Sequence, residues 1–318
     1  MGSRPAVLCP IDFSNASRTA LRYASAVAEH FRAEVTVLTV NDPLLTEVAA
    51  LRLGPAWMPE DSERELRRFF AKTFEQQGPA SVDVHFEIAA GKPAPEILRV
   101  ARERGADLIV MGTHGLTGVR KMFFGSTAER VLRETTVPVL LAPAIETGSI
   151  QLEDLKRTIR HVLVPVDLSD ATARQIRIAS ALAEALEATL LVTYVIEPYR
   201  YPLPPHISLP SVDAERRGRA EPALEELVTT VPPHVKAEAL VAYGDAAEEI
   251  AKIAHDRKIG LIVMGLHASP LAGPRMGSVT YRVLCLAPTP VLALPPAHEA
   301  QQPADVTVHG SQFTVRGS

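Results

Sequence analysis

The chain contains the segment VLCPIDFS at residues 7–14, and the same pattern returns as VLVPVDLS at residues 162–169. In both copies an apolar run with one proline ends at an aspartate, and a serine follows two positions later. Such a run predicts a buried strand that ends in a turn, with Ser14 or Asn15 placed to cap a helix in the first copy. The segment therefore predicts a strand–turn–helix unit that the chain uses twice.

Two further blocks return in the same order along the chain. The block LIVMGTHG at 108–115 returns as LIVMGLHA at 261–268, and GSTAERVL at 125–132 returns as GSVTYRVL at 277–284. The three displacements are 155, 153 and 152 positions. This period is the length of a domain and is too long for a solenoid repeat, so we predict a duplicated domain.

The duplication predicts a first domain at 1–145, a linker at 146–159, a second domain at 160–295 and a tail at 296–318. Both domains alternate apolar strands with amphipathic helices in the order β-α-β-α-β-α-β-α-β. This alternation predicts an α/β fold in which a mainly parallel, doubly wound sheet is covered on both faces. For the tail, an added strand and a frayed terminus both stay open.

Composition narrows the class of protein. The formal net charge of −4 and the pI near 6.2 argue against a nucleic-acid partner, which would require a basic stripe. No apolar run reaches the roughly 18 residues of a membrane span, and the stretch before the first strand lacks a secretory signal pattern. Cys9 and Cys285 fall in apolar segments, so we expect buried thiols in a reducing, cytoplasmic compartment. We expect no metal held by protein ligands alone.

One glycine pattern lies between a strand and a helix and predicts a phosphate-binding site. Gly112 and Gly115 are followed, after nine residues, by Gly125, Ser126 and Thr127. Glycines permit positive φ and a close approach of the backbone, and a helix N-terminus offers free N–H groups to an anion. Open parallel sheets also bind ligands at the carboxyl ends of their strands. The alternative that stays open is that these glycines only form turns and a helix cap.

Together with the Pro-x-Asp that ends the first strand and the Met-Gly-x-His-Gly block, this pattern resembles the ATP-binding members of the universal stress protein family, in a tandem form. The resemblance covers about residues 5–143 and 160–295. It implies an adenine-nucleotide α-hydrolase-like fold, with sheet order 3-2-1-4-5 in each half. It also implies that the final strands, 137–142 and 290–294, pair across a pseudo-twofold axis. The chain would then be an intramolecular pseudo-dimer, with a homodimer of chains also open.

The resemblance assigns the first nucleotide site to the ends of the strands and to the glycine pattern. Its adenine and ribose contacts match Asp12 and Val40. The complete expected set is Pro10, Ile11, Asp12, Val40, Met111, Gly112, His114, Gly115, Gly125, Ser126 and Thr127. From the residues alone, Asp12 as a structural turn residue stays open. We expect His114 to bind rather than to act as an acid or base, because no carboxylate or nucleophile stands near it in sequence. Two interpretations of Arg120 and Lys121 stay open: they contact phosphate groups, or they are a solvated surface pair.

The second half departs from this pattern. Ala268 stands where the first half has Gly115, and eight residues rather than nine separate it from Gly277. A Cβ atom and a shorter loop both oppose a close approach to phosphate, so we expect the second site to be weak or absent. The second-site positions that match are Asp167, Val195, Gly265, His267, Gly277 and Ser278.

The function that we predict is a nucleotide-dependent regulatory module of the stress response. It would bind ATP, with Mg²⁺ left open, and act on an unidentified protein partner, without a nucleic-acid or membrane partner. One alternative is a slow Mg²⁺-dependent ATPase, for which the sequence offers no distinctive base. The other is a nucleotide-free interaction scaffold. Segments 42–59 and 198–210, at the carboxyl side of the sheet, are predicted to be either lids or plain connectors.

Overall fold

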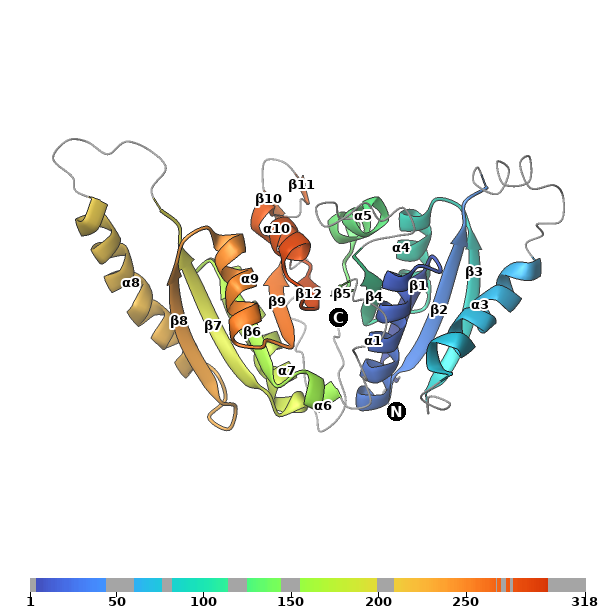
Figure 1. Cartoon of the computed structure of the whole chain (residues 1–318), viewed down its shortest axis with the longest axis horizontal. Helices are drawn as coiled ribbons and strands as arrows, with labels where there is room; N and C mark the ends of the chain where they lie inside the picture. Colours follow the sequence, from blue (N-terminus) through green and yellow to red (C-terminus); the bar gives the residue numbers. More distant parts are fainter. Residues whose placement is uncertain are drawn as a thin grey trace.

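The computed structural model of the chain describes residues 4–43, 60–75, 82–113, 125–143, 155–198, 209–266, 268–269, 273–274 and 277–296. Its main feature is one ten-stranded sheet with the order β3-β2-β1-β4-β5-β12-β9-β6-β7-β8. Each half supplies five of these strands in the order 3-2-1-4-5, as predicted. Figure 1 shows the halves side by side, with β5 and β12 at the centre and β3 and β8 at the outer edges.

The first half alternates strands and helices from the amino end. Its elements are β1 (Ala6–Ile11), α1 (Asn15–Phe31), β2 (Glu34–Asn41), α3 (Glu60–Phe74), β3 (Asp83–Ala90), α4 (Pro93–Glu103), β4 (Leu108–Gly112), α5 (Ser126–Glu134) and β5 (Val139–Ala142). The pairs β1–β2, β2–β3, β1–β4 and β4–β5 are all parallel.

The second half repeats this order after the short helix α6 (Leu155–Thr158). Its elements are β6 (His161–Val166), α7 (Ala171–Leu186), β7 (Thr189–Ile196), α8 (Leu209–Thr229), β8 (Ala237–Tyr243), α9 (Ala246–Asp256), β9 (Leu261–Gly265), β10 (Ala268–Ser269), β11 (Gly273–Pro274), α10 (Ser278–Leu286) and β12 (Val291–Leu294). Segment 198–210 falls outside the described residues at 199–208, and α8 begins at its end with Pro210 in the first turn.

The two halves join through their last strands. β5 pairs antiparallel with β12, with Leu141 opposite Val291, Leu140 opposite Leu292, and Val139 opposite Ala293. The reciprocal register places a pseudo-twofold axis at this pair, as the resemblance implied. The two expected five-stranded sheets are therefore one continuous sheet, because each half covers the edge strand of the other.

Two apolar layers hold the helices on the sheet. Side chains alternate along each strand, so Val7 and Cys9 face one layer while Leu8 faces the other. The first layer lies under α1, α3, α7 and α8, and the second lies under α4, α5, α9 and α10. Burial raises the pKa of the Cys9 thiol, which keeps this group protonated and unreactive. Cys285 is only half-buried, so the expectation of a fully buried thiol was wrong for that residue.

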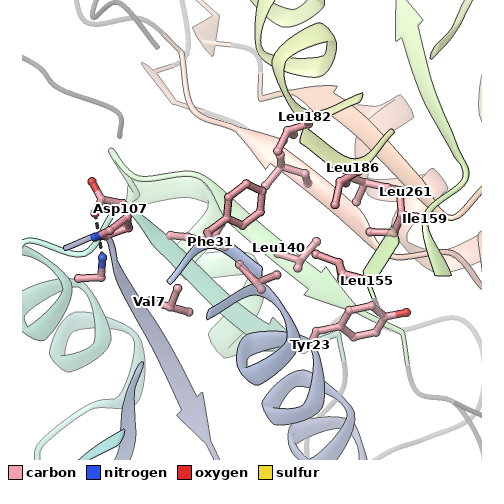
Figure 2. Close-up of a pocket in the computed structure, with 15 residues that line it drawn as sticks. Val7, Tyr23, Phe31, Asp107, Leu140, Leu155, Ile159, Leu182, Leu186 and Leu261 are labelled. Carbon is pink, nitrogen blue, oxygen red and sulfur yellow. Dashed lines mark hydrogen bonds between the residues drawn. The ribbon is translucent and has the colours of Figure 1, made fainter. Parts of the chain in front are cut away.

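A cavity of about 60 Å³ lies between the helices of the two halves. Figure 2 shows Phe31 of α1 and Leu182 of α7 pointing toward one another over Leu140 of β5. Asp107 lies at one end of the cavity, where its Oδ2 accepts the Ala6 N–H at 2.9 Å. The lining contains none of the predicted nucleotide residues, so this space is separate from the predicted site. Within the described part of the chain, no helix has the length and apolarity of a membrane span.

Candidate functional site

The predicted site residues lie at the carboxyl edge of the first half. β1, β2 and β4 are parallel, so their ends meet at one edge, and α5 begins there after β4. In Figure 1, α5 and α10 lie at the same edge of the sheet, opposite to α6. The fold therefore brings together segments that are about 100 residues apart in sequence.

Asp12 organises the turn from β1 into α1. Its Oδ1 accepts the Ser14 N–H at 3.1 Å and the Ser17 hydroxyl at 2.6 Å, while the Asp12 N–H donates to Ser17 Oγ at 3.0 Å. Ser14 caps α1 by accepting the Ser17 N–H at 3.1 Å. Between them Phe13 has a φ of 64°, which L-residues rarely adopt. The structure therefore gives Asp12 the turn role that sequence left open, and it places the carboxylate at the predicted edge.

Gly112 ends β4 against the first turn of α1. A Cβ atom there would lie 2.8 Å from Ala16 Cβ and 2.9 Å from the Ala16 carbonyl carbon. Its φ is not positive, so of the two properties of glycine considered, the structure uses the close approach of the backbone at this residue. Close packing of the strand on the helix explains the glycine, and Ala16 is the partner that sequence reasoning missed.

The two ends of the glycine pattern are tied together by one hydrogen bond. The Gly125 N–H donates to the Thr113 carbonyl oxygen at 2.9 Å, and the Thr113 N–H donates to the Ala142 carbonyl oxygen at 3.1 Å. The start of α5 is thereby held beside the ends of β4 and β5. His114, Gly115, Arg120 and Lys121 lie outside the described residues.

The N-terminus of α5 has the chemistry of an anion site. Gly125 is the N-cap and supplies no side-chain hydrogen bond, and the first helical bond runs from the Glu129 N–H to the Gly125 carbonyl at 2.9 Å. The N–H groups of Ser126 and Thr127 precede this ladder, with the positive end of the helix dipole behind them. Glu129, the acidic residue of the first turn, is paired with Arg133 one turn later. In the part of the chain that the structure describes, the backbone N–H groups of Ser126 and Thr127 therefore lie at the carboxyl edge of the sheet, as expected.

Other predicted contacts lie within the strands. Pro10, Ile11 and Met111 are buried, so their side chains belong to the core and not to the exposed surface of the edge. Val40 is half-buried near the end of β2 and is the register partner of Ala89 on β3. Segment 42–59, with Trp57, lies outside the described residues apart from its first two positions.

An exposed cation that sequence reasoning missed lies beside the end of β2. Gly91 has a φ of 148°, and its N–H donates to the Asn41 carbonyl oxygen at 2.9 Å. Lys92 follows as the exposed N-cap residue of α4. Gly244 stands 153 residues later with the same φ of 148°, so the duplication marks this turn, but the residue after it is Asp245 and the cation itself is not repeated.

The second half presents a weaker version of the first turn. Asp167 is exposed, and its Oδ1 accepts the Ser169 N–H at 3.0 Å and the Thr172 hydroxyl at 3.4 Å. Leu168 repeats the strained backbone of Phe13 with a φ of 60°. Helix α7 starts from Asp170, which makes no side-chain cap bond. Both halves therefore form the same kind of turn, but the aspartate of the second half is exposed and its hydrogen bond to a hydroxyl group is longer.

The loop after β9 has its own structure. β10 and β11 pair antiparallel, with Ala268 opposite Pro274 and Ser269 opposite Gly273. Ala268, the counterpart of Gly115, is therefore in an extended ribbon. Gly277 caps α10 as Gly125 caps α5, while His267 lies outside the described residues.

The charge at the second edge is also different. Asp245 occupies the position of Lys92, caps α9 by accepting the Ala247 N–H at 3.2 Å, and pairs with Arg282 of α10 at 2.6 Å. The hydrogen bond from Arg282 lowers the pKa of Asp245, which keeps it ionised. Arg282 also lies 3.2 Å from Glu248. The second edge thus carries a carboxylate where the first carries an ammonium group.

These features define a tandem duplicate of a doubly wound α/β domain with a glycine-bounded turn at its carboxyl edge. The sequence model described as "Universal stress protein family" matches residues 4–143 and 158–295. The chain belongs to the universal stress protein family.

Similar proteins agree with this assignment. A universal stress protein of Methanocaldococcus jannaschii is 35% identical over 141 residues, covering 42% of this chain and 79% of that protein. The universal stress protein YxiE of Bacillus subtilis is 32% identical over 143 residues, covering 42% of this chain and 96% of that protein. The crystal structure of a universal stress protein from Archaeoglobus fulgidus superposes on 91% of this chain and 98% of its own, with a TM-score of 0.63 and 22% identity. This last likeness supports the tandem fold.

Proposed function

We propose that this chain is an ATP-binding regulatory module of the stress response and that its first half holds the principal site. The observation that carries the proposal is the tie between Gly125 and Thr113, which holds the uncapped N-terminus of α5 at the edge where β4 ends. Helix N-termini at this edge of a parallel sheet are suited to phosphate groups.

Other residues at the same edge as the Gly125–Thr113 hydrogen bond support contacts with the adenosine part of the nucleotide. Asp12 and Val40 lie at the ends of β1 and β2, on the side where an adenosine group would extend from phosphates at α5. Lys92 adds a positive charge near Val40, through the Gly91 bond to Asn41. Mg²⁺ would arrive with the phosphates and would supply charge neutralisation there.

Binding rather than turnover is the proposed activity, and the cytoplasm is the proposed location. Phosphoryl transfer depends on positioned cations and an oriented water. The Asp12 carboxylate is already engaged with Ser14 and Ser17, which suits a structural acceptor better than a base. Sustained ATP hydrolysis on the order of 1 s⁻¹ or faster, lost on substitution of Asp12, would contradict this proposal.

The experiment is a pair of matched valine substitutions. Mass spectrometry first identifies any nucleotide released from the purified chain. Calorimetry then compares ATP binding by the natural chain, Gly115→Val and Ala268→Val, which change equivalent positions of the two halves. We expect Gly115→Val to abolish binding in a folded protein and Ala268→Val to leave it unchanged. Equal ATP affinity in the natural chain and in folded Gly115→Val would overturn the proposal.

A further inference from the structure

Three side chains meet at the amino edge of the first half, opposite to the predicted nucleotide site. Glu34 begins β2, while Asp83 and His85 are the first and third residues of β3. Glu34 and Asp83 are register partners, and His85 lies two positions further along the same strand. All three side chains therefore lie on one face of the sheet. Pairing of β2 with β3 over eight positions fixes this arrangement through the backbone.

The distances in this cluster suit a shared ion better than direct hydrogen bonds. His85 Nε2 lies 3.9 Å from Glu34 Oε2 and 3.8 Å from Asp83 Oδ1, and the three candidate ligand atoms lie within 4.8 Å of one another. Hydrogen bonds of this kind have lengths of about 2.7–3.2 Å. Two ligands with metal bonds of about 2.1 Å at the tetrahedral angle are separated by about 3.4 Å. Small side-chain rotations are therefore sufficient to coordinate a metal.

The neighbouring charged side chains that the structure describes do not stand between the three candidate ligand atoms, so a metal ion can reach them. Arg4 Nη1 lies 3.7 Å from Asp83 Oδ2, on the other oxygen from the one nearest His85. The next residue on the same face of β3, Glu87, is paired with Arg104 at 2.7 Å. The side chains of Glu34, Asp83 and His85 are 37%, 55% and 48% exposed, so an ion in solvent can reach them.

The donor set selects the class of ion. An imidazole nitrogen with two carboxylate oxygens suits Zn²⁺ and other first-row divalent metals. Calcium and magnesium prefer all-oxygen sites, so the histidine argues against them.

The second half provides an internal comparison at the same positions. Sheet register places Thr189, Lys236 and Glu238 where the first half has Glu34, Asp83 and His85. There Lys236 Nζ lies 3.8 Å from Glu238 Oε1, so an ammonium group already occupies the equivalent space. The duplicated scaffold thus carries the cluster in one half only.

We propose that Glu34, Asp83 and His85 bind one first-row divalent metal ion, such as Zn²⁺, which joins the edge strand β3 to β2. This proposal replaces the expectation from sequence that no metal is held by protein ligands alone. This proposal does not depend on nucleotide binding, because the cluster is at the opposite edge of the sheet.

The test is calorimetric titration of ZnCl₂ into the full chain after removal of metals with EDTA. We expect one Zn²⁺ per chain, with an affinity that falls at least tenfold in His85→Ala and in Asp83→Asn. Control variants are Glu238→Ala, at the position equivalent to His85, and His234→Ala, which removes a separate exposed pair with Glu184 at 2.9 Å. Both controls should bind Zn²⁺ like the natural chain. Circular dichroism in EDTA verifies that each variant is folded.

A gain-of-function variant tests whether register alone builds the site. Thr189→Glu, Lys236→Asp and Glu238→His together transplant the cluster to the second half, and we expect the stoichiometry to rise from one ion to two. Three results would overturn the proposal: no Zn²⁺ binding by the natural chain, an unchanged isotherm in His85→Ala and Asp83→Asn, or loss of binding in His234→Ala instead.

Discussion

The turns after β4 and β9 start from the same Leu-Ile-Val-Met-Gly sequence and continue differently. In the first half, Gly125 bonds back to Thr113 and holds the N-terminus of α5 at the edge of the sheet. In the second half, β10 and β11 form a small ribbon that includes Ala268. The strands and helices around both turns remain equivalent. Apolar packing maintains the scaffold in both halves, so the carboxyl edge of each half is free to diverge.

The largest expected difference between the halves is in nucleotide affinity. We expect one tight ATP per chain, with the second half at least 100-fold weaker, because of Ala268, the ribbon and the replacement of the Lys92 cation by Asp245. A factor of 100 corresponds to about 2.7 kcal/mol. Calorimetry on the natural chain measures the stoichiometry, and two equal, independent sites would contradict this expectation.

The next difference concerns the glycines that end β4 and β9. Gly112→Ala should lower the free energy of unfolding by about 1–3 kcal/mol, because the added methyl overlaps Ala16. Gly265→Ala should be neutral or stabilise by up to about 1 kcal/mol, because its nearest neighbour, Gln175 Oε1, would lie 3.7 Å from the new atom.

Urea denaturation of the two glycine variants checks this pair. Gly218→Ala is the control for a glycine-to-alanine change without any close neighbour, since its Cβ would meet nothing within 4 Å. Equal losses of stability in Gly112→Ala and Gly265→Ala would show that the two strand ends pack alike.

The aspartates that end β1 and β6 should differ by a smaller amount. Asp12→Ala should cost about 1–2 kcal/mol of unfolding free energy, since it leaves the Ser14 N–H and the Ser17 hydroxyl without their acceptor. Asp167→Ala should cost less than about 0.5 kcal/mol, because Asp167 is exposed. Asp12→Asn keeps an acceptor oxygen and should recover part of the loss in the same denaturation experiment. If Asp12→Asn is as destabilising as Asp12→Ala, the negative charge rather than the acceptor matters.

The smallest expected effect depends on pH. Arg282→Ala should lower the free energy of unfolding slightly at pH 7, because it removes the partner of Asp245 across α9 and α10. Arg282 lowers the pKa of Asp245 in the folded chain, so this stabilisation is present above the ordinary value of 3.8 and is lost as the pH falls through the lowered one. Denaturation at pH 7 and near pH 3 measures the change. The control is Arg130→Ala, at the equivalent position of the first half, where Arg130 pairs along its own helix with Glu134. If the loss of stability in Arg282→Ala does not become smaller in acid, the pairing of Arg282 with Asp245 is not its cause.

Much of the fold follows from sequence because its signals are local or repeated. The alternation of apolar strands and helices predicted the parallel sheets, and the displacement of about 153 residues predicted the duplication. The cap at Ser14 followed from residue type and position. The resemblance supplied the strand order and the pairing of β5 with β12, which local periodicity does not contain.

Part of the candidate site followed from sequence for the same reason. Gly125 at the N-cap of α5 and Asp12 at the end of β1 were placed correctly by their positions in the pattern. The packing of Gly112 on Ala16 was not predicted, since this contact depends on how closely β4 and α1 approach. Lys92 was missed because its place at the edge depends on pairing between β2 and β3.

The two domains, the class of fold and the positions of the glycines around the turn follow from residue type and periodicity along the chain. Which distant side chains share a surface follows only from how the strands pair. Glu34 and His85 are 51 positions apart and meet only through strand register, while Lys236 occupies the same register in the other half. Register depends on the summed packing of whole strands, so no short segment of sequence contains it.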